Sequence, residues 1–348
     1  MKKIFAVVLV MAMLLSLAAC GAKAEEPAQS AAPAPATPAP TPEPTPEPAP
    51  SVPDEAVKVM VLNGTTGFGM ANLMDAAAKG EAQLDYEFTV ETDASNVLAA
   101  LINGSADIAA LPTNAASTVY NKTQGGVQVL ALNTLGVLYL VTDSSVNIGS
   151  VADLAGQTVY APAQNPSFIF QHIVDANGLE NVTIDNTYAQ PADLNTAVAS
   201  GQVAIAVLPE PMVTVAKSKN PNLQVALDLT AEWDAVSPAG SLVQGCVVAR
   251  TEFAEKYPDA VELFLEEYGA SIQTMMEDVE GTAAKIEANG IFTKAAVAAK
   301  AIPNCNVCFI TGSEMQTAMA EFITVMHGVA PASVGGSIPG DDFYYIGK

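Results

Sequence analysis

Positive charge is scarce in this sequence. Its 348 residues contain 14 Lys and Arg against 37 Asp and Glu, which gives a formal net charge of −23 at pH 7. Nucleic acids and anionic lipid surfaces attract basic proteins and repel a chain this acidic. The charge therefore argues against nucleic acid or anionic lipid as a partner, and we interpret the acidic surface as a means of staying soluble.

Cysteine is too rare for a disulfide framework. Three cysteines follow Cys20, and an odd number cannot all pair within the chain. Cys305-Asn-Val-Cys308 has the spacing of a redox or zinc pair, but the second pair of ligands that zinc needs is absent. We interpret Cys305 and Cys308 as small structural residues, with a local disulfide as the alternative. The sequence predicts no metal and no cofactor.

Recognisable catalytic patterns are also missing. We find no Ser, His and Asp set in a known context and no paired carboxylates in a predicted cleft. The two histidines, His172 and His327, are far apart and are interpreted as ordinary helix residues. Gly64, Gly67 and Gly69 follow a predicted strand, but their spacing matches neither a phosphate loop nor a dinucleotide loop. We therefore expect neither an enzyme nor a nucleotide-binding protein.

The sequence begins with a pattern typical of export. Lys2 and Lys3 precede an apolar run at 4–17 that is too short for a comfortable membrane span. The run ends in Leu17-Ala-Ala-Cys20, which resembles a lipoprotein cleavage motif. This resemblance implies a signal peptide at 1–20, with cleavage before Cys20 and acylation of its thiol. An ordinary signal peptide with an incidental cysteine is the alternative.

Residues 21–53 are rich in Pro and Ala, and Thr-Pro-Glu-Pro occurs at 41 and again at 45. Such a segment cannot bury a core and favours the polyproline II conformation, which extends up to about 3.1 Å per residue. We interpret it as a disordered linker that holds the folded part away from the membrane. The expected location is the cell membrane, with a lipid anchor on the extracytoplasmic face.

One stretch of the sequence occurs twice. The segment 103–114 reappears at 200–211, 97 residues later, with Ile108-Ala-Ala-Leu-Pro112 answered by Ile205-Ala-Val-Leu-Pro209. In both copies an apolar strand stops at Leu-Pro and a helical pattern follows. The strand is apolar enough to be buried on both faces, as central parallel strands are. Two similar α/β halves predict two lobes with a ligand cleft where strand ends and helix starts converge.

Two further apolar runs are interpreted as crossings between these halves. The outward crossing is placed at 136–141 and the return crossing at 242–249. They divide the folded part into lobe 1, at 54–138 and 246–348, and lobe 2, at 139–245.

Three motifs carry a family resemblance. They are Gly149-Ser-Val-Ala-Asp-Leu-Ala-Gly-Gln-Thr-Val159, Ala197-Val-Ala-Ser-Gly-Gln-Val203 with Leu208-Pro-Glu-Pro211, and Val247-Val-Ala-Arg-Thr-Glu-Phe253. Across 55–345 the chain resembles the type II periplasmic binding proteins. Within them it is most similar to the solute-binding lipoproteins of ABC importers that bind nitrate, taurine, alkanesulfonate or the thiamine pyrimidine. The resemblance implies an α/β fold of two Rossmann-like lobes joined by two crossing strands.

The same resemblance implies a mechanism and a set of site residues. The lobes would close around one small solute, and a membrane permease would recognise the closed monomer. Ligand contacts would come from the strand ends and helix starts, at Thr65, Thr66, Phe68, Thr113, Asn114, Tyr139, Gln164, Asn165, Ser167 and Glu210.

The scarcity of arginine bears on the ligand. Arg250 is the only arginine, and the predicted cleft loops contain neither Lys nor Arg. Binders of sulfonates and carboxylates often use a guanidinium fork. We therefore favour a neutral or cationic nitrogenous solute. If it is aromatic, it would stack on Phe68, Tyr139 or Phe168. A sulfonate or nitrate-type anion is the alternative, because helix starts alone can hold anions. A further alternative for the function is an enzyme similar to thiamine-pyrimidine synthases.

Two residues keep alternative roles. Glu210 either pairs with an amine of the ligand or serves as a carboxylate at a helix start. Trp233, the only tryptophan, either covers the cleft or anchors its loop against lobe 2.

Overall fold

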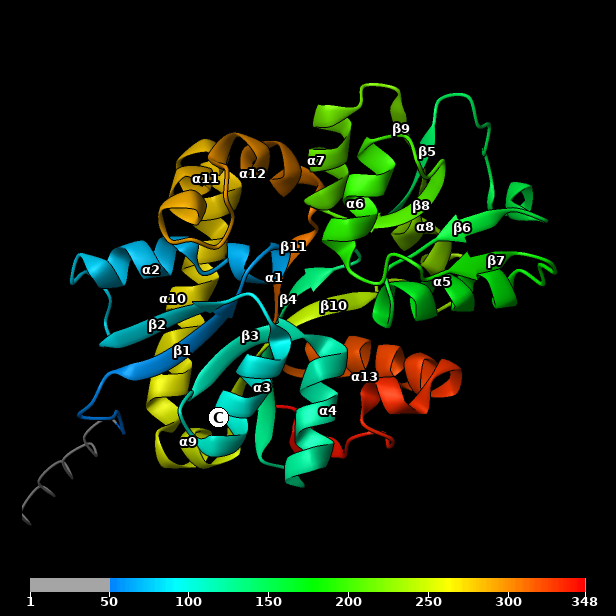
Figure 1. Cartoon of the computed structure of the whole chain (residues 1–348). Coiled ribbons are helices and arrows are strands. Elements are labelled where there is room, and N and C mark those ends of the chain that lie inside the picture. The colour runs from blue at the N-terminus through cyan, green and yellow to red at the C-terminus, as the bar shows by residue number, and fades with distance from the viewer. Residues whose placement is uncertain (1–50, 348) are drawn as a thin grey trace, which may run out of the picture. The chain divides into compact units, whose positions relative to one another are not determined.

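The computed structural model describes residues 51–347 of the chain (Figure 1). The predicted signal peptide, the predicted lipidation residue Cys20 and nearly all of the predicted linker lie outside the described residues. Within 51–347, no helix combines the length and the apolar character that a membrane crossing requires.

Lobe 1 is built from the first and last parts of the described chain. Its elements are β1 (Val57–Leu62), α1 (Thr65–Phe68), α2 (Ala71–Ala78), β2 (Tyr86–Glu91), α3 (Ala94–Asn103), β3 (Ile108–Pro112), α4 (Thr113–Thr123), β4 (Val127–Leu135), β10 (Val243–Arg250), α9 (Thr251–Lys256), α10 (Pro258–Glu277), α11 (Val279–Ala288), α12 (Ala295–Ala301), β11 (Val307–Ile310) and α13 (Gly312–Val329), with 3₁₀ turns η2 (Ile302–Asn304), η3 (Pro331–Val334) and η4 (Asp341–Phe343). The six strands form one sheet in the order β11-β4-β10-β3-β1-β2.

Lobe 2 is the continuous middle of the chain. Its elements are β5 (Leu138–Asp143), η1 (Val151–Leu154), β6 (Thr158–Tyr160), α5 (Asn165–Ala176), β7 (Thr183–Asp185), α6 (Pro191–Ala199), β8 (Ile205–Pro209), α7 (Met212–Lys219), β9 (Leu223–Asp228) and α8 (Leu229–Asp234). Its five strands form a second sheet in the order β7-β6-β8-β5-β9. Figure 1 shows the two sheets side by side in separate lobes.

The two sheets have the same topology apart from the extra edge strand β11. In each, the first parallel strand pairs with the two strands that follow it in sequence, as β1 does with β2 and β3 and β6 with β7 and β8. In each, an antiparallel strand next to a connection between the lobes lies between two others. In lobe 1 this is β10, between β3 and β4, and in lobe 2 it is β5, between β8 and β9. The repeated strands are β3 and β8, whose bounds differ by the predicted 97 residues. The predicted duplication is therefore confirmed.

Strand β3 is buried on both faces, as its apolar sequence predicted. Ile108 and Ala110 belong to the core under α10 and α11. Ala109 and Leu111 belong to the core under α3, α4 and α13. This two-sided burial follows from the alternation of side chains along a strand that helices cover on both faces.

The connections between the sheets are shorter than the sequence suggested. The predicted crossings 136–141 and 242–249 mostly belong to β5 and β10, which pair inside the sheets. The outward connection is only Gly136 and Val137, and the Val137 N–H donates to Gln244 Oε1 at 2.7 Å, which ties the two connections together. A side chain at Gly136 would collide with Thr230 and Leu242, so glycine fits this close approach.

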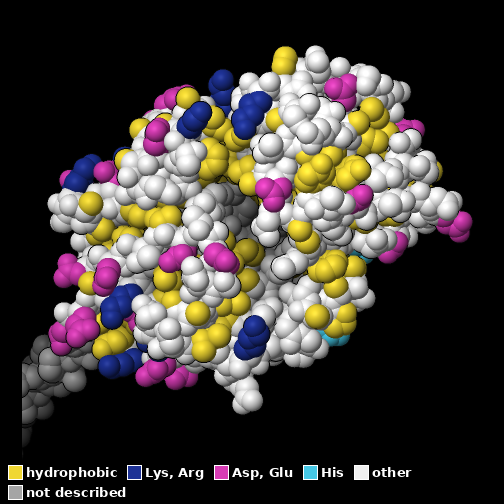
Figure 2. Space-filling model, in the orientation of Figure 1, with side chains coloured by type: hydrophobic (Ala, Val, Ile, Leu, Met, Phe, Trp, Pro, Cys, Tyr) yellow, Lys and Arg dark blue, Asp and Glu magenta, His cyan; other side chains and the backbone are white. Residues whose placement is uncertain are grey.

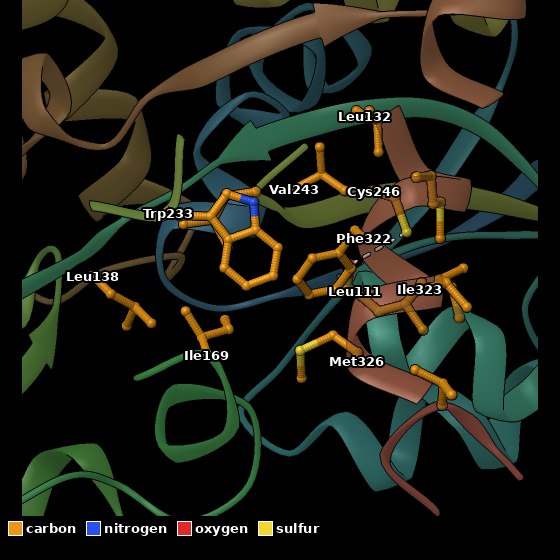
Figure 3. Close-up of a cluster of buried hydrophobic side chains, with 14 of the residues drawn as sticks. Leu111, Leu132, Leu138, Ile169, Trp233, Val243, Cys246, Phe322, Ile323 and Met326 are labelled. Atoms are coloured by element: carbon orange, nitrogen blue, oxygen red, sulfur yellow. Dashed lines mark hydrogen bonds between the residues drawn. The ribbon is translucent and has the colours of Figure 1, made fainter. Parts of the chain in front are cut away.

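Helix α13 joins the hydrophobic cores of the two lobes. Figure 3 shows Phe322 of α13 between residues of the lobe 1 sheet and Trp233 of α8. Trp233 is fully buried, and its indole N–H donates to Ser241 Oγ at 2.9 Å. Its ring lies 4.8 Å from that of His172 and 5.9 Å from that of Phe322. Trp233 is therefore an anchor inside the shared core and does not cover a cleft.

The cysteines of the described chain are unpaired. Cys305 and Cys308 form no disulfide, so the local bridge considered as an alternative is absent from this structure. Burial raises the pKa of the Cys308 thiol to about 12, which keeps it protonated at neutral pH. The two residues thus have the environment of small structural side chains.

Candidate functional site

A cavity of about 540 Å³ lies between the two lobes, and we call it the interlobe cleft. Figure 2 shows the surface hollowed in this region. Residues at the starts of six helices line the cleft: Thr65 of α1, Ala94 of α3, Asn114 of α4, Asn165 of α5, Pro191 of α6 and Met212 of α7. Three of these helices come from lobe 1 and three from lobe 2, so a ligand in the cleft would contact both lobes.

The duplicated sequence explains why the two walls face each other. Pro112 ends β3 and Pro209 ends β8, and both line the cleft. Strands β2 and β7 are also equivalent. The loops that follow them contribute Thr92 and Gln190 to the lining of the cleft. The carboxyl ends of equivalent parallel strands therefore deliver polar side chains to one cavity from both sides.

Six of the ten predicted ligand residues lie in the lining of the cleft. They are Thr65, Thr66, Asn114, Gln164, Asn165 and Glu210. Thr65 also connects the lobes directly, because its Oγ1 donates to the carbonyl oxygen of Glu210 at 2.9 Å. Asn165 Oδ1 is buried without a hydrogen-bond partner, which leaves an acceptor at the start of α5.

The structure places three other predicted residues away from the cleft. Phe68 is fully buried in the lobe 1 core, where its ring meets that of Phe292 edge-on with centroids 6.1 Å apart. Thr113 is fully buried, and its Oγ1 donates to the Val243 carbonyl at 2.8 Å. Ser167 is 6% exposed, and its Oγ donates to the Pro162 carbonyl at 2.7 Å. Each of these side chains holds a loop or helix in place and has no free face for a ligand.

Tyr139 lies in a neighbouring groove and does not line the cleft. Its hydroxyl donates to the Asn304 carbonyl at 2.8 Å, a second hydrogen bond between the lobes. Burial is the main cause that raises the pKa of this phenol, so it remains a donor at neutral pH.

The sequence analysis missed several polar residues and one aromatic residue of the lining. Phe292 reaches the cleft from the segment after α11, far from any strand end. Gln244 reaches it from the start of β10. Thr92 and Gln190 could have been found, because they follow equivalent strands of the repeat. The polar lining residues outside the prediction are Asn63, Thr92, Thr134, Gln190 and Gln244.

The lining contains a single ionisable side chain, Glu210, and neither Lys nor Arg. Glu210 is 5% exposed, and its two carboxylate oxygens accept hydrogen bonds from Thr214, at 3.1 Å from N–H and 2.9 Å from Oγ1. Burial raises the pKa of the carboxyl, although the bonds from Thr214 oppose this shift. The structure thus places the carboxylate at the start of α7, which is the helix-start role considered for it.

Two helix starts in the cleft lack an acidic partner. Helices α4 and α5 have no acidic residue in the first turn and no side-chain cap. In contrast, Asp93 caps α3 through the Ser95 N–H at 2.8 Å. Backbone N–H groups at an uncapped helix start favour oxygen acceptors and anions. The cleft therefore offers donor groups from both lobes without a cationic side chain.

Glu210→Gln tests the charge state of this carboxyl. Because the folded pKa is raised, the stability contributed by this group is present at low pH and lost as the pH rises through the folded pKa. Glutamine does not ionise, and its oxygen can still accept from Thr214. As the pH rises from about 4 to about 7, the free energy of unfolding of the variant should therefore increase relative to that of the unchanged protein. The increase should be about 1.4 kcal/mol for each unit by which folding raises the pKa of Glu210.

Urea unfolding at the two pH values measures this difference. Glu255→Gln, at an exposed position of α9, is the matched control and should change the pH dependence less. Equal pH dependence for the Glu210 variant and the unchanged protein would contradict the raised pKa.

Comparison with solved structures defines the class of fold. An ABC transporter structure from Parabacteroides distasonis is 24% identical, with a TM-score of 0.72 over 84% of this chain and 99% of that chain. The periplasmic aliphatic sulphonate binding protein SsuA from Escherichia coli is 15% identical, with a TM-score of 0.67 over 84% and 91%. The alkanesulfonate-binding protein SsuA from Xanthomonas axonopodis pv. citri, bound to MOPS, is 13% identical, with a TM-score of 0.60 over 82% and 94%. The two lobes thus have the periplasmic binding protein fold, as the sequence predicted.

The family follows from the sequence itself. The sequence model of the NMT1/THI5-like family matches residues 68–281, more than half of the chain. The protein therefore belongs to the NMT1/THI5-like family. A search of curated protein sequences found no relative.

Proposed function

We propose that this protein is the extracytoplasmic solute-binding subunit of an ABC importer. It captures one small organic solute in the interlobe cleft and delivers it to a membrane permease as a monomer anchored through acylated Cys20. The observation that carries the proposal is the cleft itself, which equivalent strand ends and helix starts of two duplicated lobes line from both sides. A solute that contacts both walls stabilises the arrangement in which the lobes are close together.

The charge of the lining supports a neutral or cationic nitrogenous solute. Glu210 is its only ionisable side chain, and the remaining polar groups are amides and hydroxyls of the kind that pair with N–H and carbonyl groups. Phe292 gives the lining one aromatic ring for contact with a flat solute. The contacts proposed for Thr65, Thr66, Asn114, Gln164, Asn165 and Glu210 are supported by their position in the lining.

A sulfonate or similar anion is the second candidate. The uncapped starts of α4 and α5 favour it, because N–H groups from both lobes can hold an anion without arginine. Three of the structurally similar proteins are named as sulfonate binders. The absence of Lys and Arg from the lining weighs against it, as does the carboxylate of Glu210.

We further propose that the protein binds its solute without chemical turnover. A hydrolytic or transfer reaction needs a nucleophile with a base, or two groups that exchange protons. The lining supplies one carboxyl, already hydrogen-bonded to Thr214, and neither histidine nor cysteine.

A thermal-shift screen tests the ligand class. The chain from Ser51, the first described residue, is heated with amines, pyrimidines, vitamins, sulfonates and nitrate. At about 100 times its Kd, a true solute adds about 2.7 kcal/mol to the free energy of unfolding and should raise Tm by about 4 °C. We expect a nitrogenous neutral or cationic compound to give the largest shift.

The outcomes separate the candidates. A shift with sulfonates or nitrate alone would replace the proposed solute class and keep the binding function. Consumption of a compound that gives a shift would contradict binding without turnover. Affinity only for macromolecules would contradict the proposal that the protein is the solute-binding subunit of an importer.

A further inference from the structure

A second cavity of about 560 Å³ lies between the lobes beside the interlobe cleft, and we call it the lysine groove. Lobe 2 supplies one wall through Tyr139 of β5, Val225 of β9 and a face of α7. Lobe 1 supplies the other through α12 and the turn η2. The lining consists of Tyr139, Glu210, Val213, Thr214, Lys217, Ser218, Val225, Ala296, Val297, Lys300 and Asn304.

The lysine groove is separate from the interlobe cleft. Glu210 is the only residue that lines both cavities. At the boundary between them, the Glu210 carbonyl oxygen accepts from Thr65 Oγ1 at 2.9 Å, and the Tyr139 hydroxyl bonds to the Asn304 carbonyl at 2.8 Å. These two contacts link the lobes where the two cavities adjoin.

Two lysines from opposite lobes face this groove. Lys217 of α7 and Lys300 of α12 are both exposed, and neither ammonium group forms an ion pair within residues 51–347. Figure 2 shows Lys and Arg side chains gathered at the top of the view, where Figure 1 places α12 and α7. In a chain with a net charge of −23, two unpaired cations on facing walls form a local site for an anion.

The walls below the lysines are apolar. Val213, Val225 and Val297 line them, and Val225 is 40% exposed although it is a large hydrophobic residue. The carboxylate of Glu210 also lines the groove and opposes an anion there, and the positive charge of Lys217 offsets part of this repulsion. The volume falls within the range of about 300–1,000 Å³ that is typical of small-molecule sites.

We propose that the lysine groove is a second ligand site, which binds an amphipathic organic anion. The acidic head group lies between Lys217 and Lys300, and the hydrocarbon part covers Val213, Val225 and Val297. Because its walls come from both lobes, an occupant contacts both and stabilises this arrangement of the lobes. The proposal does not depend on which solute fills the interlobe cleft.

Calorimetric titration with octanoate tests the site on the chain from Ser51, the first described residue. We expect saturable binding of one octanoate per chain. Acetate has the charge without the hydrocarbon, and 1-octanol has the hydrocarbon without the charge, so both should bind at least about tenfold more weakly. Raising the salt concentration should weaken octanoate binding by screening the lysines.

Lys217→Met with Lys300→Met should lower octanoate affinity by about tenfold, since two exposed ion pairs are lost. Lys219→Met removes the same charge from an exposed position of α7 outside the groove and should change the affinity less than about twofold. Ala192→Trp, which places an indole in the interlobe cleft, should leave octanoate binding unchanged.

Absence of saturable octanoate binding would overturn the proposal. So would an equal loss in the Lys219 variant, which would indicate a diffuse charge effect. Loss of octanoate binding in the Ala192 variant alone would place the ligand in the interlobe cleft and would likewise exclude the groove.

Discussion

Trp233→Ala should lower the free energy of unfolding by about 3–5 kcal/mol, the range for loss of a fully buried aromatic side chain. The indole packs against His172 of α5 in lobe 2 and Phe322 of α13 in lobe 1. Its removal leaves a cavity at the place where the two lobes share a core, and it leaves the Ser241 hydroxyl without its donor. Both effects act in the same direction.

Urea unfolding followed by circular dichroism measures this loss, because Trp233 is the only tryptophan and the variant has no indole fluorescence. Ile338→Ala, at a side chain that is 47% exposed, is the control and should change stability by less than about 0.5 kcal/mol. A change below about 1 kcal/mol in the Trp233 variant would contradict a tightly packed joint between the lobes.

The duplicated architecture could be predicted because both copies keep the same local pattern. Apolar strands that end in Leu-Pro mark β3 and β8, and a constant offset of 97 residues implies one topology used twice. The sequence could not show that β5 inserts between β8 and β9, or that β10 inserts between β3 and β4. Antiparallel insertion of these strands depends on long-range pairing, which leaves no signal in local periodicity.

The candidate site was predictable at the loops and less so at the helices behind them. Thr65 and Thr66 line the cleft, whereas Phe68, one turn further along α1, is buried in the core. Asn114 faces the cleft, whereas the preceding Thr113 turns inward to the Val243 carbonyl. For Thr113 and Asn114, helical rotation of about 100° per residue decides between these outcomes. The sequence fixes this rotation only when the first helical residue is known.

Phe292 illustrates a different limit. It reaches the cleft from the segment between α11 and α12, which has no equivalent in lobe 2. Its position depends on how α10, α11 and α12 pack on the lobe 1 sheet. Such tertiary packing cannot be derived from a repeat or from a strand-end rule.

Ala192→Trp should abolish binding of the physiological solute class while leaving the fold intact. Ala192 is exposed in the first turn of α6, and it lines the interlobe cleft. An indole at this position occupies part of the roughly 540 Å³ cavity that the solute would fill, so a solute that contacts both lobes no longer fits. We expect a loss of affinity of about 100-fold or more, with stability changed by less than about 0.5 kcal/mol.

Calorimetry with the compound that gives the largest thermal shift measures the affinity, and thermal unfolding without ligand measures the stability. Ala231→Trp, at an exposed position of α8 outside the cleft, is the matched control and should bind the compound normally. Affinity within about threefold of the unchanged protein for Ala192→Trp would place the solute elsewhere. A solute bound outside the cleft would gain nothing from the geometry that the duplication creates, because equivalent strand ends of both lobes meet around the cleft.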